Sequence, residues 1–195
     1  EGYLPLVKDR LGIASYQNLA VSGATIVGQG TSPLTEQHTS ITGNPDIILI
    51  MAGTNDFGKD QPLGTSASTG TADFYGALKT ILTNLSTSHP TSRIVLCTPL
   101  HRDFLGGQQV AGLINTNGDS LMDFNTAIKD TAGLFASPVI DVFAESGINK
   151  QNLDTFTTDR LHPNALEDVR LANTVVKGIN KILKDEMLYG EDHTT

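Results

Sequence analysis

Residues 45–56, with the sequence PDIILIMAGTND, constrain the fold of this chain more than any other stretch. A proline opens the stretch, residues 47–51 are all apolar, and the run stops abruptly at Ala-Gly-Thr-Asn-Asp. A short, unbroken apolar run that is rich in β-branched residues is typical of a parallel strand buried on both faces. The polar residues that follow then lie at the carboxyl end of the strand, where open α/β sheets bind their ligands.

Apolar patterns in the rest of the chain predict further strands and helices in alternation. Strands are predicted at residues 17–21, 93–98 and 138–142, and helices at 3–11, 72–88, 120–135 and 165–187. Gly12 follows the first helix as a C-terminal stop. Strands that alternate with amphipathic helices predict a parallel sheet covered on both faces. The expectation is a single three-layer α/β/α, flavodoxin-like domain over residues 1–188, with a frayed tail at 189–195.

Composition excludes several classes of function. The chain of 195 residues carries a formal net charge of −8 without a cluster of Lys or Arg, which argues against a nucleic-acid partner or an anionic membrane surface. No stretch approaches the roughly 18 apolar residues of a membrane span. The histidines are scattered and no Gly-rich phosphate loop follows a strand, so no metal or cofactor is implied.

The cysteine content and the first residues leave the compartment open. Cys97 lies inside an apolar run, where a buried structural thiol is expected rather than a reactive one. The chain opens at Glu1 without a signal-peptide pattern, in what reads as the middle of an element, so a targeting sequence could have been removed. A secreted or cell-surface location is favoured over the cytoplasm.

A pair of residues suited to acid–base chemistry precedes the last predicted helix, in the sequence DRLHPN at 159–164. Asp159 stands three residues before His162 in a turn, so its carboxylate can fold onto the imidazole Nδ1–H and leave Nε2 free as a general base. The alternative is a surface turn that leads into a helix. Asn164 and Glu167 match an N-cap and its capping-box partner, which explains part of the segment without chemistry.

Two further residues are candidate donors to an oxyanion. Asn55 follows the buried strand directly, so its side-chain amide points into the crevice, although an Asn after a strand also serves as a simple turn residue. Gly23 lies among the small residues of Ser-Gly-Ala-Thr and permits either a tight turn or an accessible backbone N–H.

These residues, in this order, resemble the SGNH hydrolases, the GDSL-type esterase and lipase family. The segments at 18–25 (NLAVSGAT), 53–56 (GTND) and 159–164 (DRLHPN) are similar to the second, third and fifth blocks of that family. The resemblance implies an esterase with a Ser-His-Asp mechanism. It assigns His162 as the base, Asp159 as the residue that orients it, and Gly23 N–H and Asn55 Nδ2 as the oxyanion hole.

The first block of the family, a Gly-Asp-Ser that supplies the nucleophile, is absent from residues 1–195. Gly-Asp-Ser-Leu does occur at 118–121, but Ser120 follows polar residues rather than a buried strand, and with Asp123 it matches a capping box. We therefore expect the nucleophile upstream of Glu1. In this family the nucleophile strand lies between the strands predicted at 17–21 and 47–51, so an upstream peptide of the same protein is expected to fill that place.

The resemblance leads to an expected function and two alternatives. The expectation is a serine esterase for short-chain esters, mainly acetyl and carried by a small molecule or a carbohydrate, because the polar connections 28–43, 58–71 and 101–117 suit small acyl groups. The first alternative is a non-catalytic pseudoenzyme or carbohydrate-binding module. The second is a flavodoxin-like ligand-binding or signalling domain, since a fold does not determine a function.

Overall fold

A small parallel sheet forms the centre of the molecule. The computed structural model describes residues 2–28, 33–103 and 113–190. Within these residues, strands β1 (Ile47–Met51), β2 (Arg93–Cys97) and β3 (Val139–Ile140) pair in the order β1-β2-β3, all parallel. Ile47 lies opposite Arg93 and Met51 opposite Cys97. These three strands confirm three of the four predicted ones, although β3 is short because the chain turns after it into helix α6 (Val142–Glu145).

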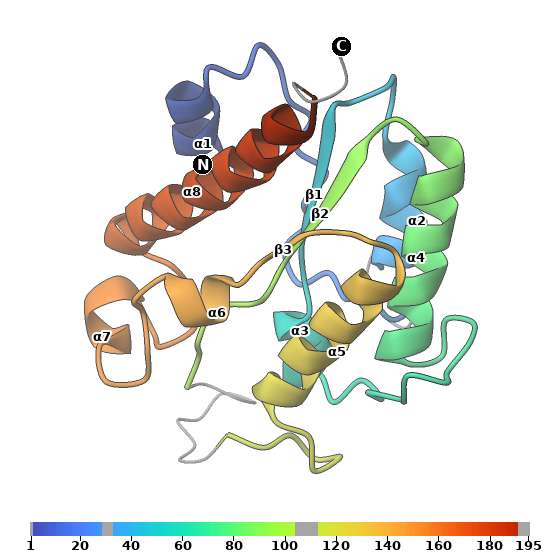
Figure 1. Ribbon diagram of the computed structural model, residues 1–195. Coiled ribbons are helices and arrows are strands. Elements are labelled where there is room, and N and C mark those ends of the chain that lie inside the picture. The colour runs from blue at the N-terminus through green and yellow to red at the C-terminus, as the bar shows by residue number, and fades with distance from the viewer. Residues whose placement is uncertain (1, 29–32, 104–112, 191–195) are drawn as a thin grey trace.

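Helices cover both faces of this sheet, as Figure 1 shows. On one face lie α1 (Leu4–Leu11) and α8 (Ala165–Gly190), which pack against each other. The other face carries α2 (Leu34–Gln37), α4 (Phe74–Ser88) and α5 (Leu121–Leu134). This arrangement confirms the predicted three-layer α/β/α fold.

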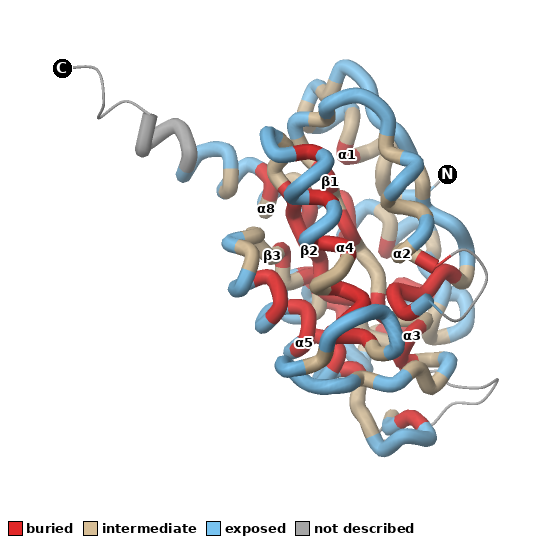
Figure 2. The backbone as a smooth tube through the Cα atoms, turned by 90° about the vertical axis from the view of Figure 1, so that its right-hand side faces the viewer, coloured by how far each residue is buried: buried red, intermediate tan, exposed pale blue. Residues whose placement is uncertain are grey.

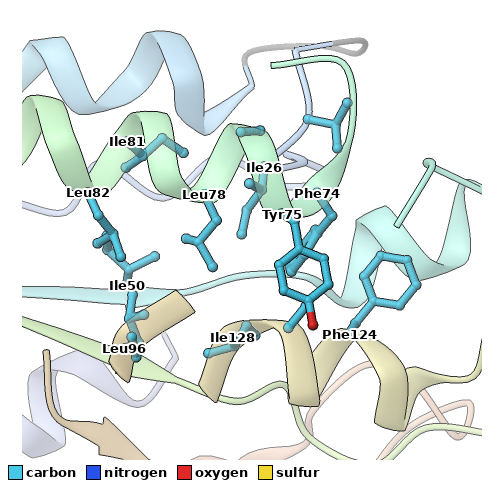
Figure 3. Packing of buried hydrophobic residues seen from close by; sticks show 14 of the residues in the cluster. Ile26, Ile50, Phe74, Tyr75, Leu78, Ile81, Leu82, Leu96, Phe124 and Ile128 are labelled. Carbon is cyan, nitrogen blue, oxygen red and sulfur yellow. The ribbon is translucent and has the colours of Figure 1, made fainter. Parts of the chain in front are cut away.

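The strands are buried on both faces because their side chains enter two separate cores. Ile50 and Leu96 point toward α4 and α5, where they meet Leu78, Ile81, Phe124 and other apolar residues (Figure 3). Val95 and Cys97 point the other way, into the core beneath α1 and α8. Buried residues accordingly concentrate on the strands and on the inner faces of the helices (Figure 2). Burial raises the pKa of the Cys97 thiol to about 12, as expected for a structural cysteine.

Helix ends follow the local sequence closely. Gly12 ends α1 in the left-handed conformation with φ of 64°, which a residue without a Cβ adopts at little cost. The side chain of Asp73 accepts a hydrogen bond from Gly76 N–H and so caps α4. Ser120 and Asp123 form the predicted capping box at the start of α5. These capping residues also mark the helix ends in the sequence, because each of them acts within one turn of the chain.

The strand predicted at residues 17–21 is wrong. This segment is irregular and largely exposed, and no other described residue pairs with it as a strand. The Asn18 side chain accepts a hydrogen bond from Ala20 N–H, a local turn that competes with strand pairing. Gln17 instead contacts Thr42 through both its amide oxygen and its amide nitrogen. A short apolar run shows only that the extended conformation is locally favoured, whereas a strand also needs a neighbouring strand with which to pair.

Several short helices occupy segments that were predicted as connections. Helix α2 and the 3₁₀ helix η1 (His38–Ser40) lie within the connection 28–43. Helices α3 (Thr54–Gly58), α6 and α7 (Leu153–Phe156) were not predicted. Elements of four or five residues are too short to show a helical period in the sequence.

Helix α8 is the longest element and runs to Gly190, into the predicted tail at 189–195, while residues 191–195 lie outside the described residues. Neither α8 nor any other described helix is both long and apolar enough to span a bilayer.

Candidate active site

A tight turn before α8 holds the predicted acid–base pair. Thr157 and Pro163 form an isolated antiparallel bridge, and Thr158 N–H donates to the carbonyl of His162 at 2.9 Å. Inside this turn, Asp159 Oδ2 lies 2.7 Å from His162 Nδ1, and Asp159 Oδ1 accepts the backbone N–H of His162 at 2.7 Å. The predicted geometry is therefore present: the Asp159 carboxylate is folded back onto the His162 imidazole.

The charge on Asp159 decides which nitrogen of His162 carries the proton. Burial alone would raise the pKa of this carboxyl, but hydrogen bonds from the backbone and imidazole of His162 and from Leu161 N–H outweigh it and lower the pKa. An ionised carboxylate only accepts hydrogen bonds, so Nδ1 is the donor and the neutral ring keeps its lone pair on Nε2. The His162 side chain is 68% exposed, and no described residue bonds to Nε2. His162 is thus arranged to take a proton from an incoming hydroxyl.

The two predicted oxyanion donors lie together on a second part of the site. Asn55 is in α3, directly after β1, and its Nδ2 donates to the carbonyl of Ala24 at 2.9 Å. Lys59, the residue after α3, donates from Nζ to the carbonyl of Gly23 at 2.5 Å, so α3 and its C-cap hold the Gly23 loop at two points. A side-chain amide has two N–H groups, so Asn55 retains a second donor beside the one that bonds to Ala24.

Gly23 adopts a backbone conformation that residues with a side chain rarely adopt. Its φ is 74°, in the left-handed region, and none of the described residues accepts a hydrogen bond from its N–H. A side chain at this position would strain the backbone and approach Lys59 Nζ at 3.6 Å. The four predicted site residues thus form two pairs, Asp159 with His162 and Gly23 with Asn55, without a direct hydrogen bond between the pairs.

Asp56 supports the second pair, and the sequence interpretation missed this role. The Asp56 carboxylate is fully buried and accepts the backbone N–H groups of Ile26 and Val27 at 2.9 and 3.0 Å. Burial raises its pKa to about 6, although these N–H groups act in the opposite direction. Asp56 therefore fixes the chain that follows Gly23. Its place beside Asn55 at a strand end was the only sequence signal for it.

Ser120 takes no part in this arrangement. Its side chain bonds to the Asp123 carboxylate and backbone N–H at the first turn of α5. Both partners are local, so the Gly-Asp-Ser-Leu sequence at 118–121 has a structural explanation, as predicted.

The capping box predicted at the start of α8 is only half present. Asn164 Oδ1 accepts the N–H groups of Leu166 and Glu167 at 2.9 and 3.3 Å, which confirms Asn164 as the cap. Glu167 does not return the bond, so its predicted part was wrong. Its side chain is turned into the protein, with 0% exposure, and neither carboxylate oxygen has a hydrogen-bond partner among the described residues.

Replacement of Glu167 by glutamine is expected to stabilise the protein at alkaline pH. Burial, with a smaller contribution from the charge of Asp168, raises the Glu167 pKa from 4.5 to about 7. Because the folded pKa lies above the unfolded one, the contribution of Glu167 to stability is fully present below pH 4.5 and is lost as the pH rises to 7. A difference of this size corresponds to about 3 kcal/mol. Urea denaturation should therefore give Glu167→Gln a higher free energy of unfolding than wild type at pH 8 and a similar one at pH 4.5.

Glu145→Gln is the matched control for this measurement. The Glu145 side chain is 49% exposed and pairs with Lys177 at the surface, so a change of less than about 0.5 kcal/mol is expected at either pH. Destabilisation of Glu167→Gln at pH 8 would show that the ionised carboxylate has a stabilising partner, contrary to the expectation.

Comparison with known proteins identifies the family of this chain. The sequence model of the GDSL-like lipase/acylhydrolase family matches residues 1–166. No functionally curated protein shows significant sequence similarity to the chain.

Several solved structures share the fold. A protein from Lactobacillus plantarum is 24% identical with a TM-score of 0.86, and the alignment covers 92% of this chain and 88% of that one. A possible lipase from Chitinophaga pinensis is 19% identical with a TM-score of 0.74, covering 93% and 89%. An acetyl xylan esterase is 19% identical with a TM-score of 0.61, covering 89% and 88%. At these identities the likeness establishes the fold alone.

The family match spans residues 1–166, which is most of the chain. The chain is therefore a member of the GDSL-like lipase/acylhydrolase family.

Proposed function

We propose that this protein is a serine esterase that hydrolyses short-chain esters, acetyl esters above all, with acetylated carbohydrates as candidate substrates. The observation that carries the proposal is His162, whose Nδ1 bonds to Asp159 at 2.7 Å while the side chain stays 68% exposed. A base that is oriented by a carboxylate and open to solvent is suited to activate a hydroxyl nucleophile.

The reaction follows from the roles of the two pairs. His162 Nε2 takes the proton from a serine Oγ as that oxygen attacks the ester carbonyl. The tetrahedral oxyanion accepts hydrogen bonds from Asn55 Nδ2 and Gly23 N–H, which stabilise the charge where it develops. His162 then gives its proton to the leaving alcohol. A water molecule releases the acyl group by the same steps, with His162 again as the base.

The nucleophile is proposed to come from a strand that pairs with the open edge of β1. On one side β1 pairs with β2, whereas no strand of the described residues pairs with its other edge. Unpaired backbone groups at a sheet edge favour the addition of a strand. A strand at this place would end beside α3 and Asn55, as a family nucleophile requires. On this proposal, residues 1–195 without that upstream segment do not hydrolyse esters.

The preference for short acyl groups rests on the openness of the site. A long acyl chain needs a buried apolar groove, because binding of its methylene groups depends on their removal from water. His162 is largely exposed instead, and residues 58–71 near α3 are mostly polar. The structural similarity to an acetyl xylan esterase supports an acetyl group on a carbohydrate as one substrate.

The test uses the protein together with the natural residues that precede Glu1. We expect it to hydrolyse p-nitrophenyl acetate and acetylated xylo-oligosaccharides with a higher kcat/KM than esters of eight or more carbons. A fluorophosphonate probe should label one serine, which peptide mapping should place upstream of Glu1. Ser120→Ala is the matched control and should retain both the label and the activity. A label on Ser120, or no hydrolysis of any ester, would overturn the proposal.

A further inference from the structure

The turn that holds Asp159 and His162 contains a strained residue with an extensive set of contacts. Arg160 has φ of 66°, in the left-handed region that residues with a side chain rarely adopt. Such a conformation persists only where the surroundings enforce it, and it is most frequent at functional sites. The contacts of Arg160 therefore show what holds the turn in place.

Asp103 bonds to Arg160 through both its backbone and its side chain. The backbone N–H of Asp103 donates to the carbonyl of Arg160 at 3.0 Å, and Asp103 Oδ2 lies 3.1 Å from Arg160 Nη2. Asp103 is 7% exposed, so this ion pair is shielded from water. Arg160 Nη2 also donates to the carbonyl of Lys150 at 2.9 Å, and Nη1 pairs with Asp154 at 2.5 Å.

Arg102, the residue before Asp103, instead contacts α3, the helix that carries Asn55. Arg102 Nη1 donates to the Thr54 carbonyl at 2.8 Å and lies 3.2 Å from the Thr54 hydroxyl. The guanidinium also covers the Phe57 ring, 5.6 Å from its centroid. Burial lowers the Arg102 pKa to about 10, against the attraction of the Asp159 charge, so Arg102 remains a cation at neutral pH.

Residues 102 and 103 therefore connect the two parts of the site, which make no hydrogen bond to each other. We propose that Asp103 and Arg160 are positioning residues, which fix the Asp159–His162 turn relative to α3, with Arg102 as the link to that helix. This inference rests on the proposed esterase function. A general base must lie within hydrogen-bond reach of the nucleophile, and an error of about 1 Å can reduce the rate about 100-fold.

The structure offers a matched pair of variants to test this. Asp103→Asn and Asp154→Asn each remove one carboxylate from the same guanidinium. Asp103 joins the turn to residue 102, whereas Asp154 is 75% exposed and joins it only to α7. For the protein with its upstream segment, we expect Asp103→Asn to lower kcat for p-nitrophenyl acetate by about 10- to 100-fold with KM changed less than about threefold. Asp154→Asn should stay within about twofold of wild type.

Variants of Arg160 provide the second measurement. Glycine relieves the left-handed strain but removes the guanidinium, so Arg160→Gly should lower kcat like Asp103→Asn even though the backbone tolerates it better. Arg160→Lys keeps the charge and should recover part of the loss. If Asp103→Asn fails to fold, this pair decides the question. A folded Asp103→Asn or Arg160→Gly with wild-type kcat would overturn the proposal.

A readout without catalysis separates this inference from the proposed function. ¹⁵N NMR at pH 8 reports the tautomer of His162, identified by loss of its signals in His162→Ala. Wild type and Asp154→Asn should show the Nδ1–H tautomer. Asp103 holds Arg160, which lies between Asp159 and His162 in a left-handed conformation, so its loss lets this backbone relax and separate the two side chains. Asp103→Asn should therefore shift the population toward Nε2–H, and an unchanged tautomer would overturn the positioning role. If no ester is hydrolysed but the tautomer shifts, the esterase function fails and the positioning role stands.

Discussion

His162→Ala is expected to lower kcat/KM for acetyl esters by about 1,000-fold or more in the protein with its upstream segment. Without the imidazole, the serine keeps its proton and the leaving alcohol has no proton donor. The effect should fall mainly on kcat, because the imidazole acts on the reacting atoms and contributes little to ground-state binding. Steady-state kinetics with p-nitrophenyl acetate measure it, and circular dichroism should show an unchanged fold, since the side chain is largely exposed.

His38→Ala is a suitable control for the loss of an imidazole. His38 belongs to η1, where Nδ1 bonds to the carbonyl of Leu34 and Nε2 to Asn84, so it contacts neither part of the site. Its kcat/KM should remain within about twofold of wild type. If ester hydrolysis persists in His162→Ala at the wild-type rate, the base has been assigned wrongly and the flavodoxin-like alternative gains support.

Asn55→Ala is expected to lower kcat by about 10²- to 10³-fold, which corresponds to roughly 3 to 4 kcal/mol of transition-state stabilisation. The amide N–H that faces the oxyanion interacts most strongly once the carbonyl oxygen is charged, so KM should change little. Asn55 also holds the Ala24 carbonyl, so the variant is expected to lose a small amount of stability in addition.

Two measurements separate these roles of Asn55. Asn84→Ala removes an exposed amide that bonds to His38 and should leave kcat unchanged, which controls for the general effect of an Asn truncation. Thermal unfolding of Asn55→Ala records the structural loss. An Asn55→Ala protein with wild-type kcat and a lower melting temperature would mean that Asn55 is only a turn residue, and the oxyanion hole would then need another donor.

The two kinetic predictions together distinguish the esterase from a non-catalytic module. An esterase requires both variants to lose kcat, because base and oxyanion hole act on the same transition state. A carbohydrate-binding module of the same fold shows no turnover in wild type and no dependence on His162. Binding of acetylated xylo-oligosaccharides without hydrolysis, in the protein with its upstream segment, would favour that module.

Much of the central fold could be predicted because its signals are local. The apolar runs at 47–51 and 94–97 lie in strands that enter two cores, and alternation along each strand divides their side chains between the faces. Gly12 and Ser120 mark helix ends through contacts within one turn of chain. The Asp159–His162 pair also depends on a single short turn, and the bond between the two side chains formed as predicted.

Features that depend on contacts between distant segments could not be predicted from the sequence. The apolar residues at 17–21 match a strand, yet they form none, because strand formation depends on a neighbour as well as on propensity. Glu167 follows its cap at the usual spacing but turns inward, and only the packing of α8 reveals that burial. Asp56 appeared in the sequence as part of a motif, while its partners lie about 30 residues away.

The sequence by itself identified the candidate catalytic residues of this protein, and the tertiary structure showed how those residues are held together. Gly23, Asn55, Asp159 and His162 were identifiable because their residue types and order carry the resemblance to a hydrolase family. Arg102, Asp103 and Arg160 were not, since an Arg or Asp in a loop has no local signature of its partner. Only the folded chain brings residue 103 beside residue 160 and residue 102 beside residue 54, and those contacts join the turn of the proposed base to the helix that carries Asn55.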